Sequence, residues 1–245
     1  MSQTEKTRQD NQPAFVLHSY PFRETSLVIE VFTREFGRLG LVARGARRPK
    51  SALRGVLLAF QPLRISWSGR SELRTLVGAE WTGGLPQPQG LALMCGFYLN
   101  ELLLKLLHRD DPHERLFDRY HETLGALGAE NDAAVTLRRF EKDLLKELGY
   151  ALTLEREADG GAPIEPGERY AYVVERGPVR LTNGEALGNR VELIGRTLLD
   201  MAADDFTDET TLGQSKLLMR TLISHHLGDQ TLHTRQLLKD LQQLW

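Results

Sequence analysis

Five basic side chains occur within ARGARRPKSALRG, residues 43–55, a stretch without any acidic residue. They are Arg44, Arg47, Arg48, Lys50 and Arg54. Because Gly45, Pro49 and Gly55 disfavour a helix here, we predict a loop. A flexible cationic loop can follow a phosphate backbone without reading its sequence. The stretch therefore predicts a polyanion-binding loop, with Arg38 as a further contact, and a solvated surface loop is the alternative interpretation.

The N-terminal part of the chain carries a net positive charge and the remainder a net negative charge. Between Pro13 and Thr82 the sequence has 11 Lys or Arg and 5 Asp or Glu residues, whereas Gly83 to Trp245 has 18 and 26. The formal net charge of −2 conceals this division. An uneven distribution of this kind indicates that the N-terminal part faces a polyanion.

Aromatic residues accompany the basic ones, and unpaired bases stack on exposed aromatic rings in single-strand binders. Most of these aromatics are expected in the core of the fold. Phe36 lies in a turn and Trp67 near a strand end, so these two are the better stacking candidates. Six aromatics that accompany the basic residues are Phe22, Phe32, Phe36, Phe60, Trp67 and Trp81.

A second basic feature, Arg138 and Arg139, begins the apolar face of a predicted helix in TLRRFEKDLLKELGY. Arginine beside apolar surface suits a partner's carboxylate. The alternative is a pair within the helix, from Arg138 to Glu141 or Asp143. Spacing alone slightly favours that alternative.

Catalytic and metal-binding patterns are weak. We find no phosphate-binding glycine–lysine motif, no nucleophile elbow and no paired histidine–glutamate zinc motif. His225 and His226 are adjacent and so point to different sides of a helix. The lone Cys95 lies in an apolar run, which predicts a core residue, not a ligand. We therefore predict no metal, no cofactor and no catalytic site.

A rival hypothesis is an enzyme that acts on DNA, such as a metal-dependent nuclease. Its carboxylates would be Asp204, Asp205 and Asp208, in the run ADDFTDE. The same run also fits a helix N-cap at Thr207 or Asp208. A purely structural adaptor without DNA affinity is a third possibility.

The elements that must position these residues change in character along the chain. Up to residue 82 the sequence predicts five short strands, which fit a closed or nearly closed barrel of the OB type. The strands are expected at 14–20, 25–33, 38–45, 57–69 and 72–81. Gly37 is expected to supply the unusual backbone angle of a hairpin turn. Pro62 makes the fourth strand an edge or bent strand.

The remainder reads as helical. The segment GGLPQPQG at 83–90 is a Gly- and Pro-rich linker. After it we predict an all-helical domain over 91–245 with a small inserted hairpin module at 154–186. Its helices are expected at about 91–109, 112–127, 132–148, 190–203, 209–227 and 234–244. The fold class is therefore α+β, with a disordered tail at 1–13, a barrel at 14–82 and the helical domain.

The bulk composition is that of an ordinary globular protein, with 41% hydrophobic and 26% charged residues. No run of about 18 apolar residues predicts a membrane helix. The polar start has no secretory apolar region, and one cysteine fits a reducing compartment. We expect a cytoplasmic, nucleoid-associated protein.

Several stretches resemble those of one known family in order, from about residue 14 to 240. AFVLHSYPFRETSLVIEVFTREFGRLGLVARGARR closely resembles the N-terminus of RecO DNA repair proteins. YLNELLLKLL, LRRFEKDLLKELGY and LMRTLISHHLGDQTLHTRQLL resemble later parts of the same family. The resemblance implies an OB-fold, a helical bundle and a small inserted module. Some members carry four zinc-binding cysteines in that module, but 154–186 has no cysteine here.

The resemblance also implies a function without catalysis. Members bind single- and double-stranded DNA, anneal complementary strands and help to load the RecA recombinase. The implied partners are RecR and the acidic, apolar C-terminal tail of the single-stranded-DNA-binding protein, with RecA acting indirectly. The LRRF motif matches the family's tail-binding surface. The residues that we assign to this surface are Arg138, Arg139, Lys142, Phe97 and Phe117.

Overall fold

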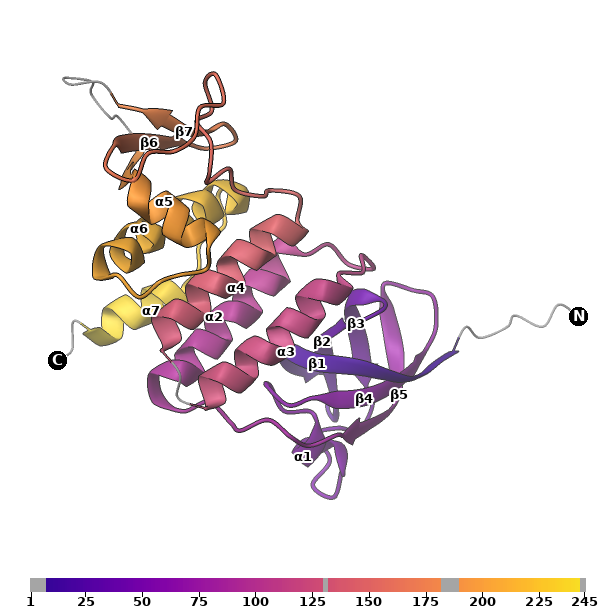
Figure 1. Cartoon of the computed structure of the whole chain (residues 1–245). Helices are drawn as coiled ribbons and strands as arrows, with labels where there is room; N and C mark the ends of the chain where they lie inside the picture. Colours follow the sequence, from indigo (N-terminus) through magenta and orange to yellow (C-terminus); the bar gives the residue numbers. More distant parts are fainter. Residues whose placement is uncertain (1–7, 130–131, 182–189, 243–245) are drawn as a thin grey trace, which may run out of the picture. The chain divides into compact units, whose positions relative to one another are not determined.

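The computed structural model describes residues 8–129, 132–181 and 190–242 (Figure 1). The chain forms two compact units. The first is built from the chain up to Asn131 and from Leu232 onward, and the second runs from Asp132 to Thr231. The structure thus groups the two helices that follow the barrel, and the last helix, with the barrel itself. Residues 82–89, where the linker was predicted, have no regular secondary structure.

The N-terminal strands form a closed five-stranded barrel, as predicted. The strands are β1 (Arg8–Phe22), β2 (Ser26–Thr33), β3 (Gly37–Ala43), β4 (Leu63–Ser68) and β5 (Leu73–Trp81). Their order around the barrel is β1-β2-β3-β5-β4. The pairing of β3 with β5 is parallel and the other pairings are antiparallel. Gly37 begins β3 with a φ of 65°, as its predicted turn requires.

Strand β1 is buried on both faces along Ala14–Leu17, which explains its unbroken apolar sequence. Ala14 and Val16 belong to the barrel core. The ring of Phe15 lies on the opposite face, with its centroid 5.4 Å from that of Phe117 and 5.1 Å from that of Tyr120. One strand therefore contributes to the barrel interior and to the contact between the barrel and its helices.

Two boundaries in the barrel differ from the prediction. We expected a tail over 1–13, but β1 begins at Arg8 and pairs with β4 from that residue onward; residues 1–7 lie outside the described part. Polar residues can form this extension because backbone groups alone make the ladder. The fourth strand begins at Leu63, directly after Pro62, because proline cannot donate to a ladder. The short helix α1 (Leu53–Val56) precedes it.

Three helices complete the first unit: α2 (Gly90–Leu106), α3 (Glu114–Gly128) and α7 (His233–Gln242). α2 packs against β1 and α3. The buried Asn100 of α2 connects them, because its side-chain amide donates to Leu17 O (2.9 Å) and its Oδ1 accepts from the Tyr120 hydroxyl (2.5 Å). Cys95 is buried, as predicted. Within the described residues no helix is long and apolar enough to cross a membrane.

The second unit combines helices with a small three-stranded sheet. Its elements are α4 (Ala133–Glu147), β6 (Arg169–Val173), β7 (Gly177–Arg180), β8 (Val191–Ile194), α5 (Gly195–Ala202) and α6 (Glu209–Leu227). The predicted hairpin corresponds to β6 and β7, and residues 182–186 of its predicted range are not described. Strand β8 was missed, because we predicted a helix from about 190. It pairs with β6, and α5 begins directly after it.

A buried carboxylate fixes the α2–α3 connection on the barrel. Glu30 of β2 is 6% exposed and forms ion pairs with Arg38 (3.1 Å) and with Arg109. Arg109 also pairs with Glu72 (2.5 Å), whose side chain is 81% exposed. The Arg109 guanidinium thus contacts one buried and one exposed carboxylate. The cost of removing each carboxylate can therefore be compared against the same partner.

We expect Glu30→Ala to lower the free energy of unfolding by about 3 kcal/mol, because it leaves two partly buried guanidinium groups without this carboxylate. Glu72→Ala is the control and should cost less than about 1 kcal/mol, since exposed pairs contribute little. Urea unfolding followed by circular dichroism measures both. Equal effects of the two variants would contradict the structural role of Glu30.

Candidate nucleic-acid interface

The basic loop, residues 44–54, leads from the end of β3 through a series of turns into the first two residues of α1. Arg48 N donates to Gly45 O (3.1 Å) and Ser51 N to Arg48 O (3.0 Å). Ala46 is fully buried and anchors the loop on the barrel core. The prediction of a loop is therefore confirmed up to Ala52, where turns hold the backbone in place, whereas Arg54 lies in the short helix α1.

The five loop cations all point to solvent. None of them forms an ion pair with any residue that the structure describes, in contrast to the paired Arg34, Arg38 and Arg74 of the same barrel. The Arg47 guanidinium donates to Arg23 O and Glu24 O (3.4 and 3.3 Å). Such exposed, uncompensated cations are available to phosphate groups.

Arg38 is held differently from the loop cations. Its side chain is 17% exposed, pairs with Glu30 and donates from Nε to Leu107 O (3.1 Å). Assigning Arg38 to a phosphate contact remains a prediction, and the structure places its guanidinium in the contact between β3 and the end of α2.

The aromatic residues are distributed otherwise than we expected. Trp67 is 1% exposed and packs edge-on against the half-buried Phe36, with 5.2 Å between ring centroids. Trp67 therefore cannot offer a ring face to a base, and selecting it was wrong. Trp81 is 60% exposed. Its position directly before Thr82–Gly84, where β5 ends, was the available sequence signal.

The three basic residues predicted on α4 all contact their own unit. Arg138 is buried and pairs with Glu141 (2.9 Å), which was the alternative within the helix. Arg139 is exposed and donates to Asp204 O (3.1 Å). Lys142 pairs with Asp204 Oδ1 (2.5 Å) and donates to Met201 O (2.7 Å). Of these three charged groups, the guanidinium of Arg139 is the most accessible.

The two aromatic residues predicted with them lie in the first unit. Phe117 is buried against Phe15 and Phe32 and is part of the core. Phe97 is 41% exposed and lines a mostly apolar pocket of about 630 Å³. The predicted set is therefore divided between the two units.

The Phe97 pocket is lined by apolar side chains of α2 and by the start of α7, with Lys105 and His18 also at the wall. Glu101 lies in the same wall, and its carboxylate accepts from His233 N, Thr234 N and the Thr234 hydroxyl (2.7–2.9 Å). Burial alone would raise the pKa of Glu101, but these hydrogen bonds outweigh it and lower the pKa below its ordinary value. The carboxylate therefore stays charged at the N-terminus of α7, where the helix dipole favours it.

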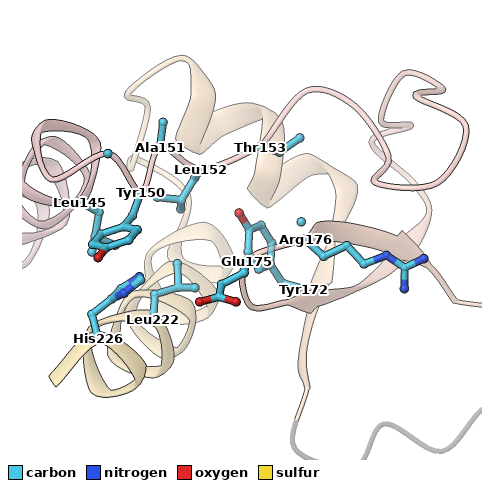
Figure 2. A pocket seen from close by; sticks show the side chains of 12 residues that line it. Leu145, Tyr150, Ala151, Leu152, Thr153, Tyr172, Glu175, Arg176, Leu222 and His226 are labelled. Carbon is cyan, nitrogen blue, oxygen red and sulfur yellow. The ribbon is translucent and has the colours of Figure 1, made fainter. Parts of the chain in front are cut away.

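A second pocket, of about 280 Å³, lies in the second unit (Figure 2). The rings of Tyr150 and His226 stack with 3.8 Å between their centroids, and Glu175 and Tyr172 face them across the pocket, whereas Arg176 points away. Burial, with a smaller contribution from His225, lowers the pKa of His226. The imidazole therefore favours its neutral form, which suits stacking more than anion binding.

The carboxylates of the rival nuclease hypothesis are engaged in local structure. Asp204 pairs with Lys142, and Asp208 caps α6 by accepting from Thr211 N (2.8 Å). Asp205 accepts from the Thr207 hydroxyl and amide (2.7 and 3.0 Å), and these hydrogen bonds lower its pKa. In the described part of the chain no group of three or more His, Cys, Asp or Glu residues is arranged to hold a metal ion.

Comparisons with known proteins agree over nearly the whole chain. The family model described as Recombination protein O N terminal matches residues 8–85, and Recombination protein O C terminal matches residues 87–236. The DNA repair protein RecO of Nitrosospira multiformis is 59% identical over 240 residues, which is 98% of this chain and 99% of that protein. The DNA repair protein RecO of Aromatoleum aromaticum is 55% identical over 242 residues, 98% of this chain and all of that protein.

The contact of Glu101 with α7 should make stability depend on pH. Because the pKa of Glu101 is lowered on folding, the charged form stabilises the fold above its ordinary pKa of 4.5, and this contribution is lost as the pH falls through the lowered value. We expect Glu101→Gln to cost about 1 kcal/mol at neutral pH and nothing at sufficiently acid pH. Urea unfolding at both pH values measures this, with the exposed Glu122→Gln as control. A cost independent of pH would contradict the role of the charge.

Proposed function

Because the chain belongs to the RecO family of DNA repair proteins, we propose that it binds single- and double-stranded DNA through the basic loop of its barrel. The observation that carries this proposal is the run of five exposed loop cations without a paired carboxylate in the described structure. These cations would replace the counterions condensed on the DNA phosphates and release them into solution, so that binding needs no base-specific contact.

The activity that we propose is mediation without catalysis. Neutralising the phosphates of two strands lowers their mutual repulsion, which favours annealing of complementary strands. With RecR, the protein would hold DNA while the single-stranded-DNA-binding protein is displaced, and so help RecA to load. The contacts of Asp204, Asp205 and Asp208 described above argue against the nuclease alternative, since none of the three is left to gather around a metal.

We further propose that the second unit receives the C-terminal tail of the single-stranded-DNA-binding protein at Arg139 of α4. Such a tail presents a terminal carboxylate, acidic residues and an apolar end, and an arginine fork suits its carboxylates. Arg139 is exposed and keeps one contact, to the carbonyl of Asp204. Arg138, which we also assigned, would need to leave its buried pair with Glu141.

The basic loop is tested by changing Arg44, Arg47, Arg48 and Lys50 together to Ala. We expect weaker binding on every DNA sequence and a salt dependence that is flatter by about 0.7 per lost phosphate contact on single strands. Fluorescence anisotropy of a labelled oligonucleotide across a salt series measures both.

The matched control removes four exposed cations of the second unit, Arg169, Arg176, Arg196 and Arg220, and so changes the net charge equally. It should leave the salt slope of DNA binding unchanged. An unchanged slope in the loop variant would show that the loop does not touch phosphates.

The tail contact is tested by calorimetry with a peptide of the tail. We expect Arg139→Ala to weaken peptide binding tenfold or more, because truncating an arginine in such a pair costs about 2–5 kcal/mol. DNA binding should change little. Arg138→Ala should weaken peptide binding similarly, and its melting temperature must be measured too, because it also breaks the buried pair with Glu141. Normal peptide binding by both variants would place the tail elsewhere.

A further inference from the structure

Trp81 presents a fixed aromatic face at the surface of the barrel. It ends β5, is 60% exposed, and donates from its indole Nε1 to Oε1 of the buried Gln61 (2.7 Å). This hydrogen bond fixes the orientation of the ring. An exposed tryptophan held in one orientation loses little conformational freedom when a ligand packs on it.

The ring forms one wall of a surface hollow of about 360 Å³, which we call the Trp81 hollow. Leu58, 48% exposed, contributes to its apolar wall, and Gln87 adds an exposed amide. The hollow is lined by Gly55, Val56, Leu58, Gln61, Trp81, Leu85 and Gln87. None of these residues is acidic, so nothing in the lining repels an anion.

The Trp81 hollow is continuous with the basic loop. Gly55 and Val56 line it, and Arg54, the last loop cation, directly precedes them in α1. Helix α1 packs against β5, the strand that carries Trp81. A ligand that fills the hollow therefore lies next to the segment that carries Arg54, which favours an anionic ligand with a flat apolar part over a neutral peptide.

We propose that the Trp81 hollow receives one unpaired base of a DNA strand whose phosphates lie on the basic loop. The proposal rests on the DNA binding proposed above and adds a preference for single strands. Bases in a duplex are stacked on each other and cannot offer a free face, whereas an unpaired base can stack on the indole. Because every base has such a face, we expect no sequence preference.

The test compares Trp81→Ala, Trp81→Phe and wild type for binding to a thymine oligonucleotide and to a duplex of equal length. We expect Trp81→Ala to weaken single-strand binding about fivefold to a hundredfold, with duplex binding and the salt slope unchanged. Trp81→Phe should restore most of the affinity, since it keeps an aromatic face. In wild type we expect the thymine oligonucleotide to quench tryptophan fluorescence through Trp81, and Trp81→Phe should remove this part of the quenching.

The controls separate this inference from the proposed function. Val77→Ala changes another exposed apolar residue of β5, outside the hollow, and should have no effect on binding. Circular dichroism melting establishes that each variant is folded, and Gln87→Glu, which adds a negative charge at the hollow without removing the indole, should also weaken single-strand binding.

Each outcome decides one point. If the wild-type protein binds neither the thymine oligonucleotide nor the duplex, the proposed function itself is refuted. Wild-type affinity in Trp81→Ala, or an equal loss on single strands and duplex, would overturn only the stacking inference. If Trp81→Ala does not fold, undiminished single-strand binding by Gln87→Glu would overturn it instead.

Discussion

The buried carboxylate of Glu30 is the constraint on which the first unit depends. A carboxylate with 6% exposure is costly unless cations compensate it, and Arg38 and Arg109 both do so. The pairing brings the segment after α2 against the β2–β3 turn, where Asp110 N donates to Arg38 O (3.0 Å). A Cβ on Gly37 would lie 2.0 Å from Asp111 O, so only glycine permits this approach.

This constraint divides the basic residues of the barrel into two groups. Arg38 compensates the buried charge of Glu30 and supports the contact with the end of α2. The loop cations beyond Ala43 form no ion pair with a carboxylate in the described structure. Sequence could not separate the groups, because an arginine in a strand and one in a loop look equally basic. The separation follows from Glu30, whose buried carboxylate pairs with Arg38 of β3 and with Arg109 in the segment after α2.

The sequence predicted those parts of the fold that depend on local pattern. The five strands, the basic loop and the helices α2, α3, α4 and α6 follow from periodicity, turn residues and capping. Strand β8 did not, because Val191–Ile194 is too short to distinguish from the helix that follows it. The sequence also favoured Trp67 as an exposed ring, whereas the structure buries Trp67 and exposes Trp81. Exposure depends on which residues cover each ring, and the position of a ring in its strand does not show this.

The physical character of the proposed interface suits the strand annealing that we propose, which requires DNA to be released again. Binding carried by exposed cations is sequence-independent and sensitive to salt, so a strand can slide and exchange. A deep pocket for bases would hold the strand too firmly for annealing, which requires every base to reach its complement. A shallow aromatic face at the edge of the loop would favour unpaired strands at a small cost per base. Once a complementary strand pairs, that face would have no base to hold, and the duplex would rest on the loop cations alone.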